Sequence, residues 1–485
     1  MTRTSKYELS GESIAEFTGG RLVSGAGLYA TGGASIDTRT IRPGQVFFAL
    51  DGERSRGVRF VETAQEKSAA GIVVSDADLQ DPAVVRVIES GRVFVVAVPD
   101  TTDALIAAAR NWADILSPKV VAITGSVGKT TVKNLTSAAI GAARPTHWTT
   151  GNHNNRLGVS LTCLGLRPSH EVLVAEMGMN APGEIAELCT IVKPDVGLVT
   201  TVAPVHLEGL GSIDNVAAAK SELIRSLGPG ATAILNADDH LVAGMMTIAE
   251  ENGARVVWFG SCEAADVRLL DAQADHDGRV VARISVFGRE CRVNLRLVGI
   301  HNAMNAAAAL AAAAVCGVDP EEACRAMAAV EPGKHRMELT DIGTIRLVDD
   351  CYNSSPKSVE AALEALASIA GPRRRVAVLG DMLEMGEHTD AIHREMGRVA
   401  AEHQVNCLIA VGRNASTIAG AAVVGGIPRS EVFEAPDSLA AASLARELLR
   451  PRDVVLVKAS RGVGLELVVD ALKARFGQGN TEAGN

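Results

Sequence analysis

Short apolar runs recur along the chain and alternate with longer segments whose apolar residues are spaced three and four positions apart. A short apolar run bounded by polar residues predicts a buried strand, and the three-and-four spacing predicts an amphipathic helix. Because strands alternate with helices, we expect mostly parallel sheets flanked by helices, which is an α/β fold.

The pattern divides the chain into blocks that we expect to be domains. Residues 1–117 are expected to form a small mixed α/β domain, residues 118–331 a central domain with a mostly parallel sheet, and residues 332–476 a Rossmann-like domain. The tail, residues 477–485, has no apolar anchor and is expected to be disordered. The strand-like runs behind this division are 46–50, 71–75 and 93–98, then 120–124, 171–177, 195–202, 232–238 and 255–260, and finally 345–350, 374–381, 406–412 and 453–460.

Some segments depart from this alternation. Residues 266–298 favour antiparallel strands, and the alanine-rich stretch 306–317 predicts a buried helix. The chain has no uninterrupted run of about 18 apolar residues, the length that a membrane-spanning helix needs. The first residues, 1–13, are polar and lack the apolar region of a signal peptide. We therefore expect a cytoplasmic protein with no membrane partner.

Composition narrows the possible partners. The chain of 485 residues carries 47 basic and 57 acidic residues, a formal charge of −10, which argues against a nucleic-acid partner. Hydrophobic residues make up 47% of the chain, enough for several cores. Its 8 cysteines include no C-x-x-C pair, so we expect neither a zinc site nor a disulfide framework, in keeping with a reducing compartment.

A candidate phosphate-binding loop lies at "AITGSVGKTT", residues 122–131. It follows an apolar run and precedes a helix-like segment, so backbone N–H groups and the helix N-terminus would point at an anion. Gly125 and Gly128 allow close backbone approach, Lys129 offers a charge for the β- and γ-phosphates, and the Thr130 hydroxyl is the expected Mg²⁺ ligand. The loop is a shortened form, G-x-x-G-K-T. The alternative is a chance glycine turn before a helix.

Polar residues at the ends of other central strands are further candidates, because ligands of open α/β sheets bind at the carboxyl ends of the strands. Glu176 ends one apolar run, His206 follows the next, and Lys220 lies on a helix-like segment. A buried acid at a strand end needs a partner, which a cation held with Thr130 would supply. A lone histidine is more often structural, and a helix lysine is more often solvated.

The chain resembles the Mur ligase family in order along nearly its whole length, from about residue 10 to 475. The shortened phosphate loop is itself the form found in that family. The segments that carry the resemblance are "TGSVGKTT", "GNHNNRLGVSLTCL", "VAEMGMNAPGEIAEL", "VHLEGLGSIDNVAAAKSEL", "LVGIHNAMNAAAAL", "LVDDCYNSSP", "VLGDMLEMGEHTDAIHREMG" and "VKASRGVGLE".

The resemblance implies a central ATPase domain and an ATP-dependent amide ligase of peptidoglycan synthesis, and so a part in cell shape and division. ATP would phosphorylate a carboxylate of UDP-N-acetylmuramoyl-tripeptide, and D-Ala-D-Ala would attack the acyl phosphate through its amine. The family also implies a monomer that uses ATP and two Mg²⁺ ions. The alternatives are a related ligase with another carboxylate or amine, an NTP-driven switch, and a non-catalytic scaffold.

The resemblance also implies roles for individual residues. Thr130 and Glu176 would hold one Mg²⁺, and His206 with a carbamylated Lys220 would help to hold the second. Lys129, His206 and Lys220 would be catalytic. The nucleotide would be bound by Gly125, Ser126, Val127, Gly128, Lys129, Thr130, Thr131, Asn302, Asn305, Arg336 and Asp350. For Asn302 and Asp350 the alternative role is to cap the helix that follows.

The residues that bind the UDP-linked substrate are expected in the first block and at the paired asparagines. Ser35, Asp37 and Arg39 lie in a segment similar to the one that binds the uridine diphosphate, and Asn154 and Asn155 would lie near the muramoyl-peptide. In the segments expected to bind these substrates, the chain lacks some acidic and histidine residues that are usual in the family. The phosphate loop shows no such departure. The departures are Arg56, Val58, Arg59 and Arg156.

Overall fold

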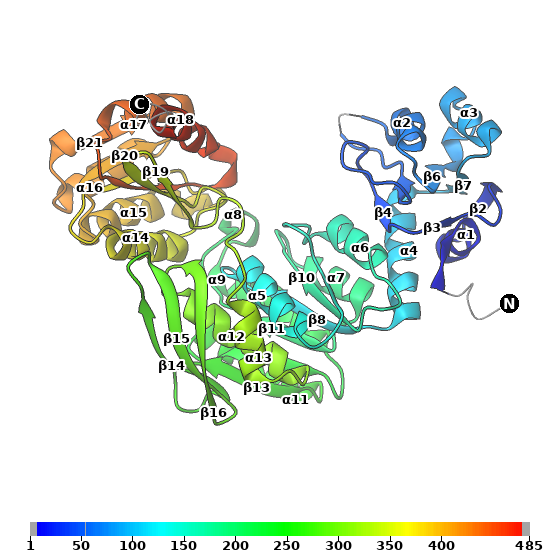
Figure 1. Ribbon diagram of the computed structural model, residues 1–485, viewed down its shortest axis with the longest axis horizontal. Coiled ribbons are helices and arrows are strands. Elements are labelled where there is room, and N and C mark those ends of the chain that lie inside the picture. The colour runs from blue at the N-terminus through cyan, green and yellow to red at the C-terminus, as the bar shows by residue number, and fades with distance from the viewer. Residues whose placement is uncertain (1–6, 54, 478–485) are drawn as a thin grey trace, which may run out of the picture.

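The computed structural model describes residues 7–53 and 55–477, which form three α/β domains in a row. The N-terminal and C-terminal domains lie at opposite ends of the molecule, with the central domain between them (Figure 1). The α/β fold class expected from the sequence is confirmed. The predicted disordered tail lies, apart from Gly477, outside the described residues.

The N-terminal domain is a small sheet covered by helices. β2 is antiparallel to β7, and the other neighbouring strands are parallel. The sheet order is β2 (Arg21–Ser24), β7 (Phe94–Val98), β6 (Gly71–Ser75), β5 (Val46–Phe48) and β4 (Ala34–Ser35), with a separate pair β1 (Leu9–Ser10) and β3 (Tyr29–Ala30). Its helices are α1 (Gly11–Thr18), α2 (Val61–Glu66), α3 (Pro82–Ser90) and α4 (Thr101–Leu116).

The central domain is built on one sheet that changes from parallel to antiparallel at one end. Its order is β16 (Arg289–Val298), β15 (Arg279–Val286), β14 (Val267–Ala274), β13 (Arg255–Gly260), β12 (Thr232–Asn236), β11 (Val196–Val199), β8 (Lys119–Thr124), β10 (Val172–Glu176) and β9 (Thr146–Trp148). The helices are α5 (Lys129–Gly141), α6 (Arg156–Leu164), α7 (Glu184–Val192), α8 (Leu207–Leu210), α9 (Ile213–Arg225), α10 (His240–Ala243), α11 (Met246–Glu251), α12 (Asn302–Val315) and α13 (Pro320–Met327).

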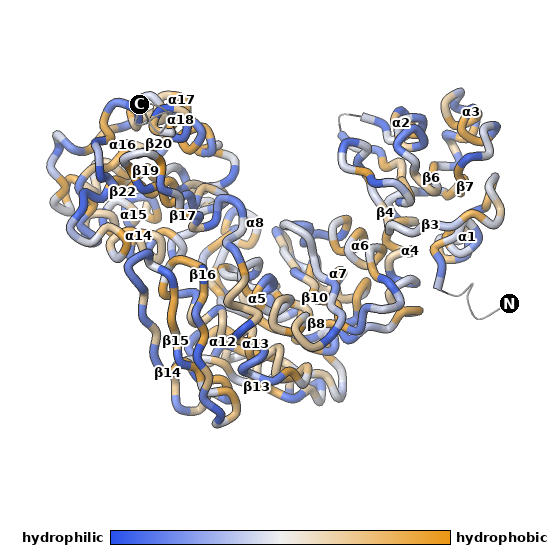
Figure 2. The backbone as a smooth tube through the Cα atoms, in the orientation of Figure 1, coloured by the Kyte–Doolittle hydropathy of each residue, from blue (hydrophilic) through white to orange (hydrophobic). Residues whose placement is uncertain are grey.

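The hydropathy of the strands explains the two parts of this sheet. β8, β10 and β11 are covered on both faces and are almost entirely buried, as parallel strands between helices should be. β15 and β16 alternate buried and exposed residues, and Figure 2 shows hydrophobic and hydrophilic residues alternating along them. The predicted antiparallel strands within 266–298 are therefore confirmed, and β14 joins them to the parallel part by pairing with β13.

The C-terminal domain is a second doubly covered sheet, parallel except for one edge strand. The order is β17 (Glu338–Ile342), β18 (Ile345–Asp349), β22 (Val454–Lys458), β19 (Arg375–Gly380), β20 (Cys407–Val411) and β21 (Val432–Ala435), with only β17 antiparallel to its neighbour. Its helices are α14 (Pro356–Ala370), α15 (Thr389–Glu402), α16 (Ala415–Val424), α17 (Ser438–Leu448) and α18 (Glu466–Phe476). Apolar clusters fill both faces of this sheet.

The helices begin where the sequence supplies capping side chains. Asp81, Asp100, Ser212, Asp319 and Asp437 precede α3, α4, α9, α13 and α17, and each accepts a backbone N–H from the first turn. Such a cap satisfies an N–H group that has no partner inside the helix. The alanine-rich α12 is buried along most of its length, as predicted. Among the helices that the structure describes, none is long and apolar enough to cross a membrane.

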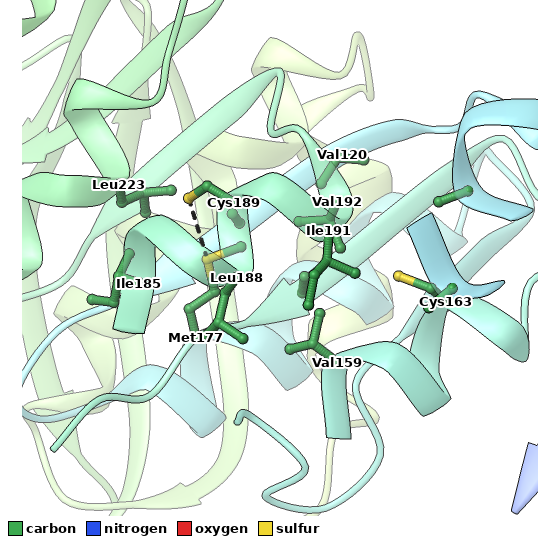
Figure 3. Packing of buried hydrophobic residues seen from close by; sticks show 14 of the residues in the cluster. Val120, Val159, Cys163, Met177, Ile185, Leu188, Cys189, Ile191, Val192 and Leu223 are labelled. Atoms are coloured by element: carbon green, nitrogen blue, oxygen red, sulfur yellow. Dashed lines mark hydrogen bonds between the residues drawn. The ribbon is translucent and has the colours of Figure 1, made fainter. Parts of the chain in front are cut away.

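The N-terminal and central domains share one hydrophobic core through α4. This cluster joins Phe94 and Trp112 of the first domain to Val159 and Leu173 of the central one. The Trp112 indole also donates a hydrogen bond to the Leu166 carbonyl at 3.1 Å. Figure 3 shows the central part of the cluster, where side chains of α6, α7 and α9 meet those of β8 and of the chain just after β10. The shared core attaches the first domain firmly to the central one.

Candidate active site

The phosphate loop has the backbone form that its sequence predicts. β8 ends at Thr124 and α5 begins at Lys129. Gly125 (φ +147°) and Gly128 (φ +88°) adopt conformations that favour glycine. A Cβ on Gly125 would lie 1.9 Å from the Thr200 hydroxyl, so the position also has no room for a side chain. The N-terminus of α5 lines the cavity described below.

Lys129 is held within this loop. Its Nζ donates to the Gly125 carbonyl at 2.6 Å and contacts the Ser126 carbonyl at 3.3 Å. Burial lowers the pKa of the Lys129 ammonium, and the nearby charge of Arg336 lowers it further while Glu176 opposes the shift. The Lys129 ammonium at the helix N-terminus, with the Arg336 charge close enough to affect it, is suited to bind a polyphosphate.

Glu176 is the acid of the site. It ends β10, the strand beside β8, and its side chain is 1% exposed. Oε1 accepts hydrogen bonds from the Thr130 hydroxyl at 3.1 Å and from Asn154 Nδ2 at 2.8 Å, whereas Oε2 is buried and has no hydrogen-bond partner among the residues that the structure describes. A buried carboxylate oxygen without a partner is costly unless a cation compensates it. Thr130 and Glu176 together therefore fit a hard cation such as Mg²⁺.

His206 connects the central domain to the C-terminal one. It lies at the start of α8 with φ +54°, and its Nδ1 is 2.5 Å from Glu384 Oε2. The backbone N–H of Glu208 donates to the Glu384 carbonyl at 3.0 Å, so side chain and backbone both join the two domains. Burial lowers the pKa of the His206 imidazole, and Glu384 opposes this, so burial favours the neutral ring.

Lys220 is buried on α9, with only 2% of its surface exposed, and not solvated as most helix lysines are. No hydrogen bond or ion pair to its ammonium occurs among residues 7–53 and 55–477. Burial, with a smaller contribution from the Lys129 charge, holds the pKa of Lys220 well below its usual value. Glu222 cannot pair with it, because its carboxylate accepts the N–H groups of Gly183 (2.7 Å) and Ala186 (3.1 Å) at the start of α7.

The C-terminal domain contributes Asp350 and Lys458 to the same cavity. Asp350 follows β18, and its carboxylate accepts hydrogen bonds from Lys458 Nζ at 2.6 Å and from the Met337 N–H at 3.1 Å. Burial raises the pKa of Asp350, although Lys458 opposes the rise. Nearby, the Arg336 guanidinium stacks on the Tyr352 ring, 3.9 Å from its centre.

The capping alternatives for two predicted residues are wrong. His301, not Asn302, precedes α12, and the Asn302 amide donates back to the Val298 carbonyl at 2.8 Å. Asn305 donates to Asn302 at 2.8 Å, and its oxygen lies against Gly128. α14 begins after Ser355, so Asp350 does not cap it. The side chains of Asn302 and Asp350 therefore do not cap these helices, and both line the cavity described next.

A cavity of about 1150 Å³ unites most of these side chains between the central and C-terminal domains. Of the predicted residues, Gly125, Lys220, Ser35, Asp37 and Arg39 do not line it, although Gly125 begins the loop. The predicted residues that line the cavity are Ser126, Val127, Gly128, Lys129, Thr130, Thr131, Asn154, Asn155, Glu176, His206, Asn302, Asn305, Arg336 and Asp350.

Ser35, Asp37 and Arg39 form a turn of the N-terminal domain instead. Asp37 accepts hydrogen bonds from the backbone and guanidinium of Arg39, and Ser35 Oγ accepts the Asp37 N–H at 3.2 Å.

The neighbouring residues Asn154 and Asn155 contact different parts of the central domain. Asn154 binds Glu176, whereas Asn155 caps α6 by accepting the Gly158 N–H at 2.9 Å.

The departures from the family pattern have local partners. Arg56 pairs with Asp78 and lies 3.5 Å from Asp51, while Arg156 lies 3.7 Å from Glu187. Val58 is buried in the core of the first domain, and Arg59 is exposed. All four lie outside the cavity-lining set.

Sequence reasoning missed Glu384, Tyr352 and Lys458 as site residues. Each lies inside a segment that carried the family resemblance, "VLGDMLEMGE", "LVDDCYNSSP" and "VKASRGVGLE". Nothing local marks them, because each is brought to the cavity by a contact distant in sequence, such as the 108 positions between Asp350 and Lys458.

Fold and site together define a phosphate-loop, nucleotide-binding protein whose cavity lies between two α/β domains. Family models match the chain as "Mur ligase middle domain" over residues 123–313 and as "Mur ligase, glutamate ligase domain" over residues 335–461. The chain belongs to the Mur ligase family.

Several curated relatives within this family carry the name UDP-N-acetylmuramoyl-tripeptide–D-alanyl-D-alanine ligase. The Bacillus subtilis protein is 33% identical over 91% of this chain and 93% of its own length. The Mycobacterium tuberculosis protein of strain H37Rv is 35% identical over 96% of this chain and 98% of its own. Among solved structures, MurF from Acinetobacter baumannii has a TM-score of 0.82 at 26% identity, covering 96% of this chain and 99% of that one. MurF ligase from Thermotoga maritima, in complex with ADP, has a TM-score of 0.74 at 26% identity, covering 92% and 98%.

Proposed function

We propose that this protein is an ATP-dependent ligase that joins D-Ala-D-Ala to UDP-N-acetylmuramoyl-tripeptide and forms the pentapeptide precursor of peptidoglycan. The names of its full-length relatives support the substrates. The observation that carries the reaction is the single cavity in which the phosphate loop and Glu176 face Asp350 and Arg336 of another domain. Phosphoryl transfer needs such a concentration of charge.

The reaction has two chemical steps. A carboxylate oxygen of the tripeptide attacks the γ-phosphorus of ATP, the bond to the bridging oxygen breaks, and ADP leaves. The amine of D-Ala-D-Ala then attacks the acyl carbon, loses a proton, and phosphate leaves as the amide forms. Lys129 and the α5 N-terminus would stabilise the charge that develops on the phosphoryl oxygens. A cavity between domains also keeps water from the acyl phosphate.

Mg²⁺ fits the donors of the site. Thr130 and Glu176 would hold one ion, since one buried oxygen of Glu176 has no partner within the described part of the chain. When bound, Mg²⁺ would neutralise negative charge as the two anions approach each other. His206 would help to hold a second ion, and its lowered pKa leaves the ring nitrogen available as a ligand at neutral pH.

Lys220 is the least expected member of the second cation site, and we propose that it is carbamylated. Its neutral amine would attack carbon dioxide: an N–C bond forms, one C–O π bond breaks, and the nitrogen releases a proton. The product is a carboxylate-like oxygen ligand. Burial without a hydrogen-bond partner and a pKa well below the usual value both favour the reactive neutral amine.

The remaining assignments concern the nucleotide, the substrates and the state of the protein. Asn302 and Asn305 would contact adenine, Asp350 the ribose and Arg336 the phosphates. The turn at 35–39 would bind the uridine diphosphate, and Asn154 and Asn155 the muramoyl-peptide. We further propose a cytoplasmic monomer whose domains comprise residues 1–117, 118–331 and 332–476.

Coupled detection of ADP tests the function. Release should require UDP-N-acetylmuramoyl-tripeptide and D-Ala-D-Ala together, with tripeptides bearing diaminopimelate or lysine assayed in parallel. Sustained ADP release in the absence of both substrates would indicate an NTP-driven switch. Turnover with another amine, but none with D-Ala-D-Ala, would indicate a related ligase of different specificity.

A further inference from the structure

The cavity contains two cationic side chains that are neither held by the phosphate loop nor engaged in an ion pair among the described residues. Its cationic lining consists of Lys129, Arg336, Lys357, Lys458 and Arg461. Lys129 donates to carbonyls of the phosphate loop. Lys458 pairs with Asp350, and Lys357 lies 3.9 Å from Asp239. Within the described parts of the chain, the guanidinium groups of Arg336 and Arg461 have no ion pair, and both lie over Tyr352.

These two arginines lie in different parts of the cavity. Arg336 stacks closely on Tyr352, and its charge lowers the pKa of both Lys129 and Lys133, so it acts on the phosphate-loop side. Arg461 lies farther from the same ring, 5.4 Å from its centre, at the start of a short 3-10 helix after β22. It is exposed to the cavity and makes no other side-chain contact of hydrogen-bond or ion-pair type among the described residues.

The neighbours of Arg461 place it beside the loop that reaches His206. The Ser460 hydroxyl accepts the Leu383 N–H at 3.0 Å, and a Cβ on Gly462 would lie 2.8 Å from the Leu383 side chain. The next residue of that loop, Glu384, contacts His206 of the central domain. Arg461 therefore lies on the C-terminal wall of the cavity, between the Tyr352 ring and the junction of the two domains.

Besides the uridine diphosphate, which the first domain would bind, three anionic groups of the substrates bear on the role of Arg461. The ATP phosphates and the tripeptide carboxylate must meet at the phosphate loop, where Lys129 and the proposed cations lie. The third is the terminal carboxylate of the amine-bearing dipeptide, which is one residue away from the reacting nitrogen and takes no part in the chemistry. It needs a cation away from the loop, and a guanidinium offers two parallel donors to a carboxylate.

We propose that Arg461 binds the terminal carboxylate of the incoming dipeptide and so selects a free acid as the acceptor. This inference rests on the proposed function. The Tyr352 ring limits the orientations of the guanidinium, and because Arg336 lies over the same ring, the dipeptide site adjoins the nucleotide site.

The test compares D-Ala-D-Ala with its C-terminal amide in steady-state ligation. The wild type should strongly prefer the acid. Arg461→Gln should raise the KM for the acid roughly 10- to 100-fold, as expected for a lost charged hydrogen bond, and should accept acid and amide about equally. KM values for ATP and the tripeptide should not change. Arg461→Lys should restore part of the preference, and Arg413→Gln, at an exposed arginine outside the cavity lining, is the matched control.

Different results identify which idea fails. A wild type that ligates D-Ala-D-Ala but shows no preference for acid over amide would overturn the role of Arg461 and leave the proposed function intact. An Arg461→Gln variant with a raised KM for ATP alone would assign the residue to the phosphates and overturn the inference. Absence of ligation of D-Ala-D-Ala by the wild type would overturn both.

Discussion

Asp350→Asn should destabilise the C-terminal domain as well as impair nucleotide binding. The change removes the carboxylate from an ion pair in which Lys458 is 2% exposed and Asp350 is 14% exposed. The asparagine has one acceptor oxygen and cannot accept from both Lys458 and the Met337 N–H, while Lys458 keeps the Asn353 carbonyl at 3.0 Å. The ammonium would then be buried without an opposite charge.

The expected magnitude follows from this burial. Removing one partner of a buried ion pair costs about 3–5 kcal/mol, and the partial exposure of Asp350 places the loss near the lower end. Lys458→Met removes the charge and fills a similar volume. The double variant should therefore recover most of the stability that Asp350→Asn loses, because two neutral side chains leave no uncompensated charge.

Hydrogen exchange is the suitable assay, because a chain of three domains does not unfold in a single two-state step. Peptides from β18 and β22, which pair in parallel, should exchange roughly 100-fold faster in Asp350→Asn, under conditions where the rate reports the opening equilibrium. Asp390→Asn, which removes an exposed ion pair on α15, should leave these peptides unchanged. A double variant as labile as the single one would refute the reasoning.

Three further predictions concern other parts of the chain. Lys129→Ala should abolish ligation with an unchanged circular dichroism spectrum, and wild-type turnover would contradict the phosphate-loop assignment. Lys220→Ala should be nearly inactive and regain some rate with acetate or propionate, whereas full wild-type activity in carbonate-free buffer would argue against carbamylation. Burial lowers the pKa of His147 to about 4 from 6.5, so the unfolded state binds the extra proton and stability falls as pH drops from 6.5 toward 4. His147→Gln should remove about 2 kcal/mol of that loss at pH 5, seen as a smaller loss of hydrogen-exchange protection in peptides from β9 between pH 7 and 5, after correction for the intrinsic exchange rate.

The phosphate loop could be predicted from the sequence because the residues that give it its backbone form follow one another along the chain. A strand, two glycines with positive φ, and a helix beginning at Lys129 follow one another within a few residues. The buried strands were equally accessible, since β8, β10 and β11 are covered on both faces and must therefore be apolar throughout. In such segments the local sequence indicates both the backbone conformation and the burial.

Tertiary structure decided which distant side chains meet. Asp350 and Lys458 are 108 positions apart, and His206 and Glu384 are 178 apart. β18 and β22 become neighbours through the strand order of their sheet, and two domains must pack together before Glu384 reaches His206. The burial of Lys220 likewise follows from the packing of α9, because a lysine on a helix carries no local sign of whether its face is covered. Charges can pair, or remain unpaired, only after the sheets and domains have assembled around them.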